Sequence, residues 1–182
     1  MAKDFIQIMD VTSIKAVLSE LRKKIVPSRF EKAIQPDSTT IQLGFRTLEG
    51  LTWVEISWHA NYPRIVEIEP PEKDSGQSTL AKQIQNVIKE GALIELKQEG
   101  FERIIEFSFA ARPKEFVQTS LIVELMGKHS NILLLDQKKT VITMGKQVRE
   151  KQSRLRPIST GDTYKEPPPL PGNVPDLSLI HI

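Results

Sequence analysis

Two stretches of the chain space their hydrophobic residues as one face of a helix does. The first can be capped by Thr12 or Ser13 and is stopped by Pro27, and its apolar face consists of Ile14, Val17, Leu18, Leu21 and Ile25. The second follows the N-cap Ser78 and stops at Gly91, and its apolar face consists of Leu80, Ala81, Ile84, Val87 and Ile88. The pattern therefore predicts two amphipathic helices.

Elsewhere apolar and polar residues alternate with a period of two, which indicates strands with one buried face. Turn residues such as Pro36-Asp37-Ser38 and Glu49-Gly50 separate neighbouring runs. The predicted strands cover residues 29–36, 40–46, 51–58, 64–69, 92–97, 103–109, 121–126, 131–135 and 141–143. Two helices with this many strands predict an α+β domain whose antiparallel sheet folds into a sandwich or barrel.

A polar elbow, Gly127-Lys128-His129-Ser130-Asn131, joins two of these apolar strands. A hairpin turn does not by itself require a cation and an imidazole, so the elbow is a candidate recognition site. Ser130 and Asn131 are expected to bond to the turn backbone, as such side chains often do. No histidine or carboxylate spacing resembles a metal motif, so no metal and no cofactor are predicted.

Positive charge is concentrated in residues 136–156. This segment holds seven basic and two acidic residues, a net charge of +5, whereas the whole chain carries only +2. Such a segment indicates a surface that faces a polyanion, and a solvated basic face without a ligand is an equally weighted alternative. Its basic residues are Lys138, Lys139, Lys146, Arg149, Lys151, Arg154 and Arg156.

The overall composition is that of one globular domain. The 182 residues are 39% hydrophobic and 26% charged, and none is cysteine, which excludes disulfides and thiol chemistry. No apolar run approaches the roughly 20 residues that span a bilayer, and the first residues lack the apolar core of a secretory signal. We therefore expect no membrane partner and a cytoplasmic location, or the plastid stroma if a transit peptide has been lost.

The C-terminal end has a different composition. Order is expected to fade after Arg156, and residues 165–182 are predicted to be a proline-rich exit linker followed by a truncated tail. The last residues, 176–182, are expected not to be native. Residues 1–164 would then form the one folded domain.

Five motifs occur in the order in which they occur in the N-terminal domain of the NFACT family. The elbow lies in Val123–Asp136, which resembles the family pattern E-x-M-G-K/R-H-S-N. The other four segments that resemble family motifs are Arg29–Pro36, Ser57–Arg64, Phe101–Phe107 and Arg156–Pro168. The residues in these motifs resemble most closely those of the cyanobacterial and plastid branch of the family.

The resemblance implies a function. Members of this family, which includes bacterial RqcH (fibronectin-binding protein A) and eukaryotic NEMF, bind stalled large ribosomal subunits that hold peptidyl-tRNA. They recruit tRNA and extend the nascent chain without mRNA, in bacteria mainly with alanine. The chain resembles their first module, without the helix-hairpin-helix, coiled-coil and RNA-binding domains. The resemblance also implies a fold similar to the N-terminal domain of formamidopyrimidine-DNA glycosylases.

The resemblance also assigns candidate site residues. The family's Asp-Arg pair, which serves tRNA recruitment, corresponds to Glu102-Arg103, and the arginine fork can hold a phosphate or a base edge. Glu102 is one methylene longer than aspartate, and an ion pair between the two neighbours is the structural alternative. Further candidate RNA contacts are Arg64, Lys128, His129, Arg149, Lys151, Arg154 and Arg156.

Aromatic residues add candidates for base stacking. Tyr62 could stack on a base beside Arg64, or pack at the sheet edge. Trp53 and Trp58 are expected on opposite faces of one strand, with one in the core and the other as a stacking surface or interdomain contact.

Two other classes of function compete with RNA binding. Glycosylases of the related fold begin with a proline followed by glutamate, whereas this chain begins Met1-Ala2-Lys3, so we expect no base-excision catalysis and no enzyme. A surface adhesin is suggested by the fibronectin-binding name. The absence of a signal or anchor and the basic segment favour RNA over a protein ligand.

Overall fold

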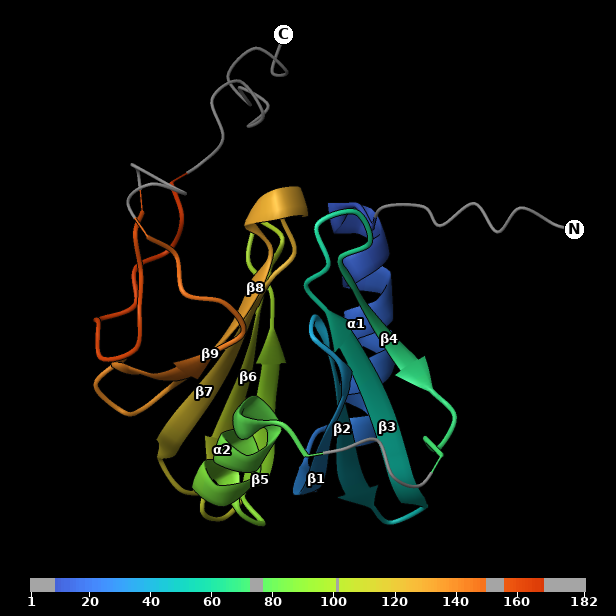
Figure 1. Ribbon diagram of the computed structural model, residues 1–182. Helices are drawn as coiled ribbons and strands as arrows, with labels where there is room; N and C mark the ends of the chain where they lie inside the picture. The colour runs from blue at the N-terminus through green and yellow to red at the C-terminus, as the bar shows by residue number, and fades with distance from the viewer. Residues whose placement is uncertain (1–8, 73–76, 101, 150–155, 169–182) are drawn as a thin grey trace, which may run out of the picture.

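The computed structural model describes residues 9–72, 77–100, 102–149 and 156–168. In these ranges the chain forms one nine-stranded antiparallel sheet and two α-helices (Figure 1). The elements are α1 (Val11–Ile25), β1 (Ser28–Asp37), β2 (Thr40–Thr47), β3 (Gly50–Ser57), β4 (Arg64–Ile68), α2 (Thr79–Ile88), β5 (Ala92–Lys97), β6 (Ile104–Ala110), β7 (Val117–Glu124), η1 (Gly127–His129), β8 (Asn131–Leu135) and β9 (Val141–Met144). The predicted α+β class and antiparallel sheet are confirmed.

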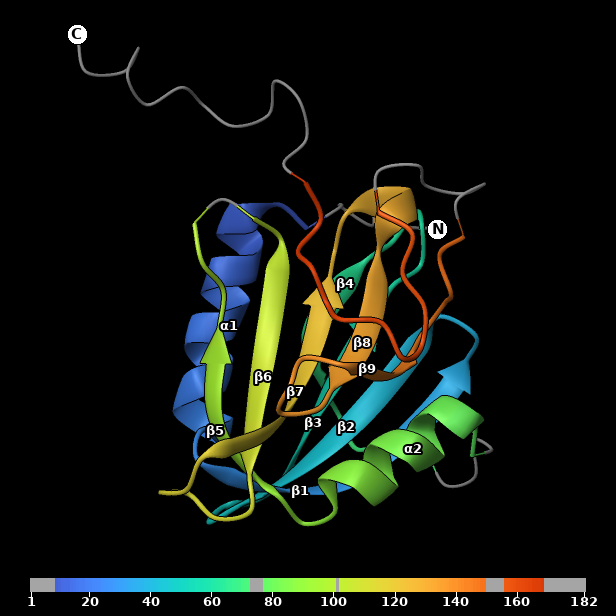
Figure 2. The same cartoon turned by 90° about the vertical axis from the view of Figure 1, so that its left-hand side faces the viewer.

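The sheet folds back on itself to form a sandwich. Its strand order is β4-β3-β2-β1-β5-β6-β7-β8-β9, so β2 and β6 are separated by two strands. Nevertheless the Phe45 ring of β2 stacks on Phe107 and Phe109 of β6, with ring centroids 6.2 and 6.4 Å apart. The two halves therefore face each other across a shared core, as Figures 1 and 2 show.

The helices cover the two open sides of this sandwich. Helix α1 packs against β2, β4 and β5, and α2 packs against β1 and β9. The predicted face of α1 is confirmed, but its N-cap is Asp10 rather than Thr12 or Ser13. The Asp10 carboxylate accepts a hydrogen bond from the backbone N–H of Ser13 at 2.7 Å, so the helix begins before the predicted caps.

Helix α2 differs from its prediction at the C-terminal end. Ser78 is the N-cap as predicted, but Val87 lies off the buried Ile84 row and is 38% exposed. The left-handed residues are Lys89 (φ 39°) and Glu90 (φ 55°), not Gly91. Gly91 is needed for space, because a Cβ there would lie 2.8 Å from the Ile88 carbonyl oxygen.

The segment after Arg156 is packed against the sheet, so the expectation that order fades there is wrong. Ile158 is 3% exposed and exchanges two backbone hydrogen bonds of 2.9 Å with Val148. It packs in a second apolar cluster with Ile122, Leu133, Leu135, Val141 and Met144, which Tyr164 adjoins. Residues 169–182, most of the predicted linker and tail, lie outside the described residues. In the described part of the chain, no helix has the length and hydropathy needed to span a membrane.

Candidate functional site

Several family motifs meet at one end of the sandwich, here named the elbow end. It is formed by the N-terminus of α1, the β3–β4 turn (residues 58–63), the start of β6 and η1, which lie together at the same end in Figures 1 and 2. Two contacts connect these parts. The Ile65 N–H lies 3.4 Å from the Met9 sulfur, and the Leu125 N–H donates to the Arg103 carbonyl at 2.9 Å.

The elbow is a single turn of 3₁₀-helix, held by two buried polar side chains. The Ser130 hydroxyl accepts from the Met126 N–H at 2.8 Å. The Asn131 amide accepts from the Lys146 N–H at 3.0 Å and donates to the Lys146 carbonyl at 2.9 Å. The prediction that Ser130 and Asn131 build the turn is confirmed, and the contact with Lys146 also fixes the end of β9.

The two middle residues of the elbow, Lys128 and His129, face solvent. The Lys146 ammonium lies beside them and donates to the Lys128 carbonyl at 2.7 Å. Partial burial lowers the pKa of His129, and the positive charges of Lys128, Lys146 and Arg156 lower it further. His129 is therefore a neutral imidazole at pH 7 within a group of cations, where a bound anion would raise its pKa.

Arg103 lies directly before β6 with a half-buried side chain. The pKa of Asp10 at the start of α1 is lowered mainly by the hydrogen bonds from Ser13, and the positive charge of Arg103 lowers it further. Within the described residues, the Arg103 side chain makes no hydrogen bond or ion pair, so the alternative pair with Glu102 is not formed. Its donors are directed to no protein acceptor in those ranges.

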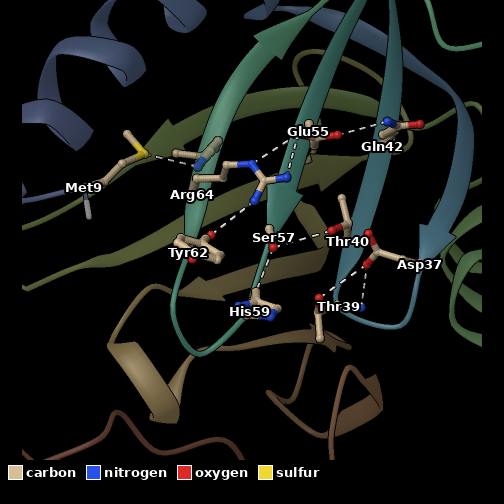
Figure 3. A network of polar contacts seen from close by, with 11 residues as sticks. Met9, Asp37, Thr39, Thr40, Gln42, Glu55, Ser57, His59, Tyr62 and Arg64 are labelled. Carbon is tan, nitrogen blue, oxygen red and sulfur yellow. Dashed lines mark hydrogen bonds and ion pairs between the residues drawn. The ribbon is translucent and has the colours of Figure 1, made fainter. Parts of the chain in front are cut away.

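Arg64 has protein partners. Its guanidinium donates to the Glu55 carboxylate at 3.2 and 3.1 Å and to the Tyr62 carbonyl at 3.2 Å (Figure 3). The Tyr62 ring does not pack at the sheet edge: it stacks on the His59 ring, with centroids 5.2 Å apart, and is 41% exposed. An RNA contact by Arg64 would have to share the guanidinium with Glu55.

Arg156 also pairs with a carboxylate. Glu124 is fully buried, and the Arg156 guanidinium donates to its two oxygens at 2.8 and 2.6 Å. Burial opposes the charge of Arg156, but the bonds to Glu124 outweigh it and raise the pKa of Arg156. The Tyr164 hydroxyl donates to the same carboxylate at 2.8 Å. The structure therefore gives Arg156 a role in the interior that the charge pattern does not reveal.

The remaining basic candidates are placed as follows. Arg149 is exposed, whereas Lys151 and Arg154 lie outside the described residues. Their RNA contacts stay predictions, as do those of the residues above. In the described ranges, no group of three or more histidine, cysteine, aspartate or glutamate residues could hold a metal ion.

The expectation that one tryptophan is exposed is wrong. Trp53 and Trp58 are 7% and 3% exposed. Each ring lies over a glycine: a Cβ on Gly44 would come within 3.1 Å of Trp53, and one on Gly145 within 2.7 Å of Trp58. Trp58 follows the last residue of β3, so strand alternation does not decide its direction.

Sequence reasoning missed Asp10 and Lys146 as parts of this end. Asp10 directly precedes the predicted helix, and aspartate is a preferred N-cap, so a local signal was present. Lys146 was visible only as one charge in the basic segment. Its position beside the elbow depends on the pairing of β8 with β9.

The structure defines a class of domain: a two-helix antiparallel β-sandwich with its polar motifs gathered at one end. A family model described as "NFACT N-terminal and middle domains" matches residues 10–178, and the chain belongs to this family. The resemblance inferred from the five motifs is thus confirmed. Placement in the cyanobacterial and plastid branch stays a prediction.

Curated relatives carry the name "Rqc2 homolog RqcH". The protein from Streptococcus suis is 32% identical over 154 residues, which cover 82% of this chain and 28% of the relative. The protein from Bacillus subtilis is 29% identical over 153 residues, covering 82% of this chain and 27% of the relative. The chain thus spans less than a third of the length of these relatives.

Solved structures support the fold. The N-terminal domain of the fibronectin-binding protein PavA from Streptococcus pneumoniae matches with a TM-score of 0.80 and 27% identity, covering 94% of this chain and 67% of that one. The N-terminal part of the fibronectin/fibrinogen-binding protein from Streptococcus suis matches with a TM-score of 0.77 and 28% identity, covering 86% and 60%.

Proposed function

We propose that this chain is the tRNA- and ribosome-binding module of a ribosome-associated quality control factor. The factor binds stalled large subunits that hold peptidyl-tRNA and recruits tRNA for mRNA-independent tailing, with alanine in bacteria. The module is not itself an enzyme, because peptide-bond formation belongs to the ribosome. Membership in the family of the RqcH relatives supports this proposal.

The arrangement of Arg103 carries the proposal. Its guanidinium makes no hydrogen bond or ion pair in the described ranges, and it lies at the elbow end with Lys128 and Lys146. A planar guanidinium can bind a phosphate or a base edge with two hydrogen bonds. The neighbouring ammonium groups would neutralise phosphates without reading sequence, so affinity should fall steeply with salt.

A matched pair of arginines tests the proposal. Arg103 precedes β6 and Arg112 follows it, roughly 25–30 Å away for an extended strand, and Arg112 is exposed. We expect Arg103→Ala to weaken binding of unfractionated tRNA, measured by fluorescence anisotropy, about tenfold or more. Arg112→Ala should bind as the parent chain does. Equal affinities of the two variants would contradict the assignment of tRNA binding to the elbow end.

The two structural neighbours are named as fibronectin-binding proteins, which favours a second candidate function, binding of fibronectin. The same chain can be passed over immobilised fibronectin in a surface-binding assay. Saturable binding to fibronectin, together with no binding to tRNA, would favour this candidate over the RNA-binding module.

A further inference from the structure

The β3–β4 turn carries two stacked aromatic rings at the elbow end. The rings of His59 and Tyr62 lie 5.2 Å apart at an interplanar angle of 19° (Figure 3). Tyr62 is 41% exposed, and the turn residues Ala60 and Asn61 beside it are also exposed. An exposed aromatic surface is therefore available at the elbow end, where the cations also lie (Figures 1 and 2).

Hydrogen bonds within the turn fix the position of both rings. The His59 N–H donates to the buried Ser57 hydroxyl at 3.3 Å, and the Tyr62 N–H donates to the His59 carbonyl at 3.2 Å. The Tyr62 carbonyl in turn accepts from Arg64. Because these bonds already order the turn, stacking of a ligand on Tyr62 costs little conformational entropy in the protein.

The same bonds set the proton position of His59. Its Nδ1 accepts a hydrogen bond from the Asn61 N–H at 3.1 Å. In the neutral imidazole the proton is therefore on Nε2, which can donate a hydrogen bond. The rings thus combine a stacking face with one hydrogen-bond donor.

The turn is mechanically joined to the elbow. Trp58, the residue before His59, packs against Gly145, and Gly145 precedes the Lys146 that is clamped by Asn131. On the other side, Ile65 lies against Met9, next to Asp10 and the charge of Arg103. The turn that carries the aromatic pair is therefore connected to the elbow through Trp58 and Gly145, and to the start of α1 through Ile65 and Met9.

We propose that the His59–Tyr62 pair stacks an unpaired RNA base whose neighbouring phosphates are neutralised by Arg103 and Lys128. The inference rests on the proposed function and adds a site for bases to it. Aromatic rings recur in the recognition of single-stranded RNA because every base has a flat face to stack. Bases paired in a duplex are already stacked and cannot use this surface, so the pair should favour unpaired segments.

Two RNA probes and three variants test the inference. The probes are a stem-loop RNA with an unpaired loop and the same stem closed as a blunt duplex, each measured by anisotropy. Tyr62→Ala should bind the stem-loop about tenfold more weakly than the parent chain and the duplex equally well. Tyr62→Phe, which keeps the ring, should bind both as the parent does. Phe116→Ala is the matched control, because Phe116 is a 92% exposed aromatic residue in the β6–β7 loop at the opposite end.

Salt dependence separates stacking from phosphate contact. Arg103→Ala should reduce the slope of affinity against salt concentration, whereas Tyr62→Ala should leave that slope unchanged. Thermal melting checks that each variant folds. If Tyr62→Ala does not fold, Tyr62→Leu, which keeps apolar volume without an aromatic face, is measured in its place and the same weakening is expected.

The outcomes distinguish this inference from the proposed function. If Arg103→Ala weakens binding and a folded Tyr62 variant without the ring binds the stem-loop as the parent does, the inference is overturned and the proposed function stands. If the parent chain binds neither RNA, the proposed function fails, and the base site fails with it. Equal weakening for stem-loop and duplex would also overturn base stacking.

Discussion

Glu124 and Arg156 form a two-point ion pair that joins the elbow motif to the last motif of the chain. They are 32 residues apart, and the guanidinium meets both oxygens of a carboxylate with no exposed surface. Glu124 is the last residue of β7, separated from the elbow by Leu125 and Met126, and Arg156 begins the segment that packs on β8 and β9. The ion pair therefore fixes the segment that begins at Arg156 to the strand that leads into the elbow.

Removal of one partner should be costly. We expect Arg156→Ala to lower the free energy of unfolding by about 3–5 kcal/mol, because it leaves a buried carboxylate unpaired. Urea denaturation followed by tryptophan fluorescence measures this. Replacing both residues by apolar ones, as in Glu124→Leu with Arg156→Met, should cost less than Arg156→Ala alone. A double variant less stable than the single one would contradict the role of the ion pair.

Tyr164, the second partner of Glu124, should make the folded state less stable at alkaline pH. Burial, with the negative charge of Glu124, raises the pKa of Tyr164 above its ordinary value of 10.0. Above pH 10 the unfolded chain loses the phenol proton while the folded chain keeps it, so stability is lost as pH rises. Tyr164→Phe should remove this contribution to the pH dependence. Just above pH 10, the phenolate absorbance of the folded parent should equal that of folded Tyr164→Phe, and a larger signal in the parent would contradict the raised pKa of Tyr164.

The two glycines beneath the tryptophans should differ in their tolerance of a side chain. A Cβ on Gly145 would lie 2.7 Å from the Trp58 ring, whereas one on Gly44 would lie 3.1 Å from Trp53. We expect Gly145→Ala to cost about 1–3 kcal/mol through overpacking, and Gly44→Ala to cost less. Thermal melting of the two variants ranks them, and the reverse order would show that the contact between Trp58 and Gly145 is misplaced.

Neighbouring elbow residues should have separable effects. Asn131→Ala removes the two hydrogen bonds to Lys146 and should lower stability by about 1–3 kcal/mol, because the part-buried backbone groups of Lys146 lose their partner. Lys128→Ala touches no such bond through its side chain and should leave stability unchanged while reducing the salt slope of tRNA binding by about one. Melting temperature and binding are measured on the same samples. A loss of stability in Lys128→Ala would contradict this separation, because it would show that the Lys128 side chain also stabilises the turn.

Local patterns were sufficient for most elements of this fold. Period-two alternation located the strands, and Ser78 gave the start of α2. The turn role of Ser130 and Asn131 also followed from their chemistry. These features depend on residues a few positions apart, which sequence reasoning can treat directly.

Long-range partners could not be predicted in this way. Arg156 was counted as a surface cation because nothing near it in sequence reveals a carboxylate 32 residues away. Trp58 was predicted to lie on one face of a strand, but the strand ends at Ser57, one residue earlier. In both cases the outcome depends on which strands meet across the sandwich, and that is set by the whole fold.

Recruitment of tRNA to the large subunit is the measurement that tests the proposed function most directly. The protein is sedimented with large ribosomal subunits that hold peptidyl-tRNA, and the recovered tRNA is sequenced. We expect the parent to recover a restricted set of tRNAs, and Arg103→Ala to sediment with subunits while recovering far less of them. Recovery by Arg103→Ala that equals the parent and the Arg112→Ala control would contradict the role of the elbow end in tRNA binding.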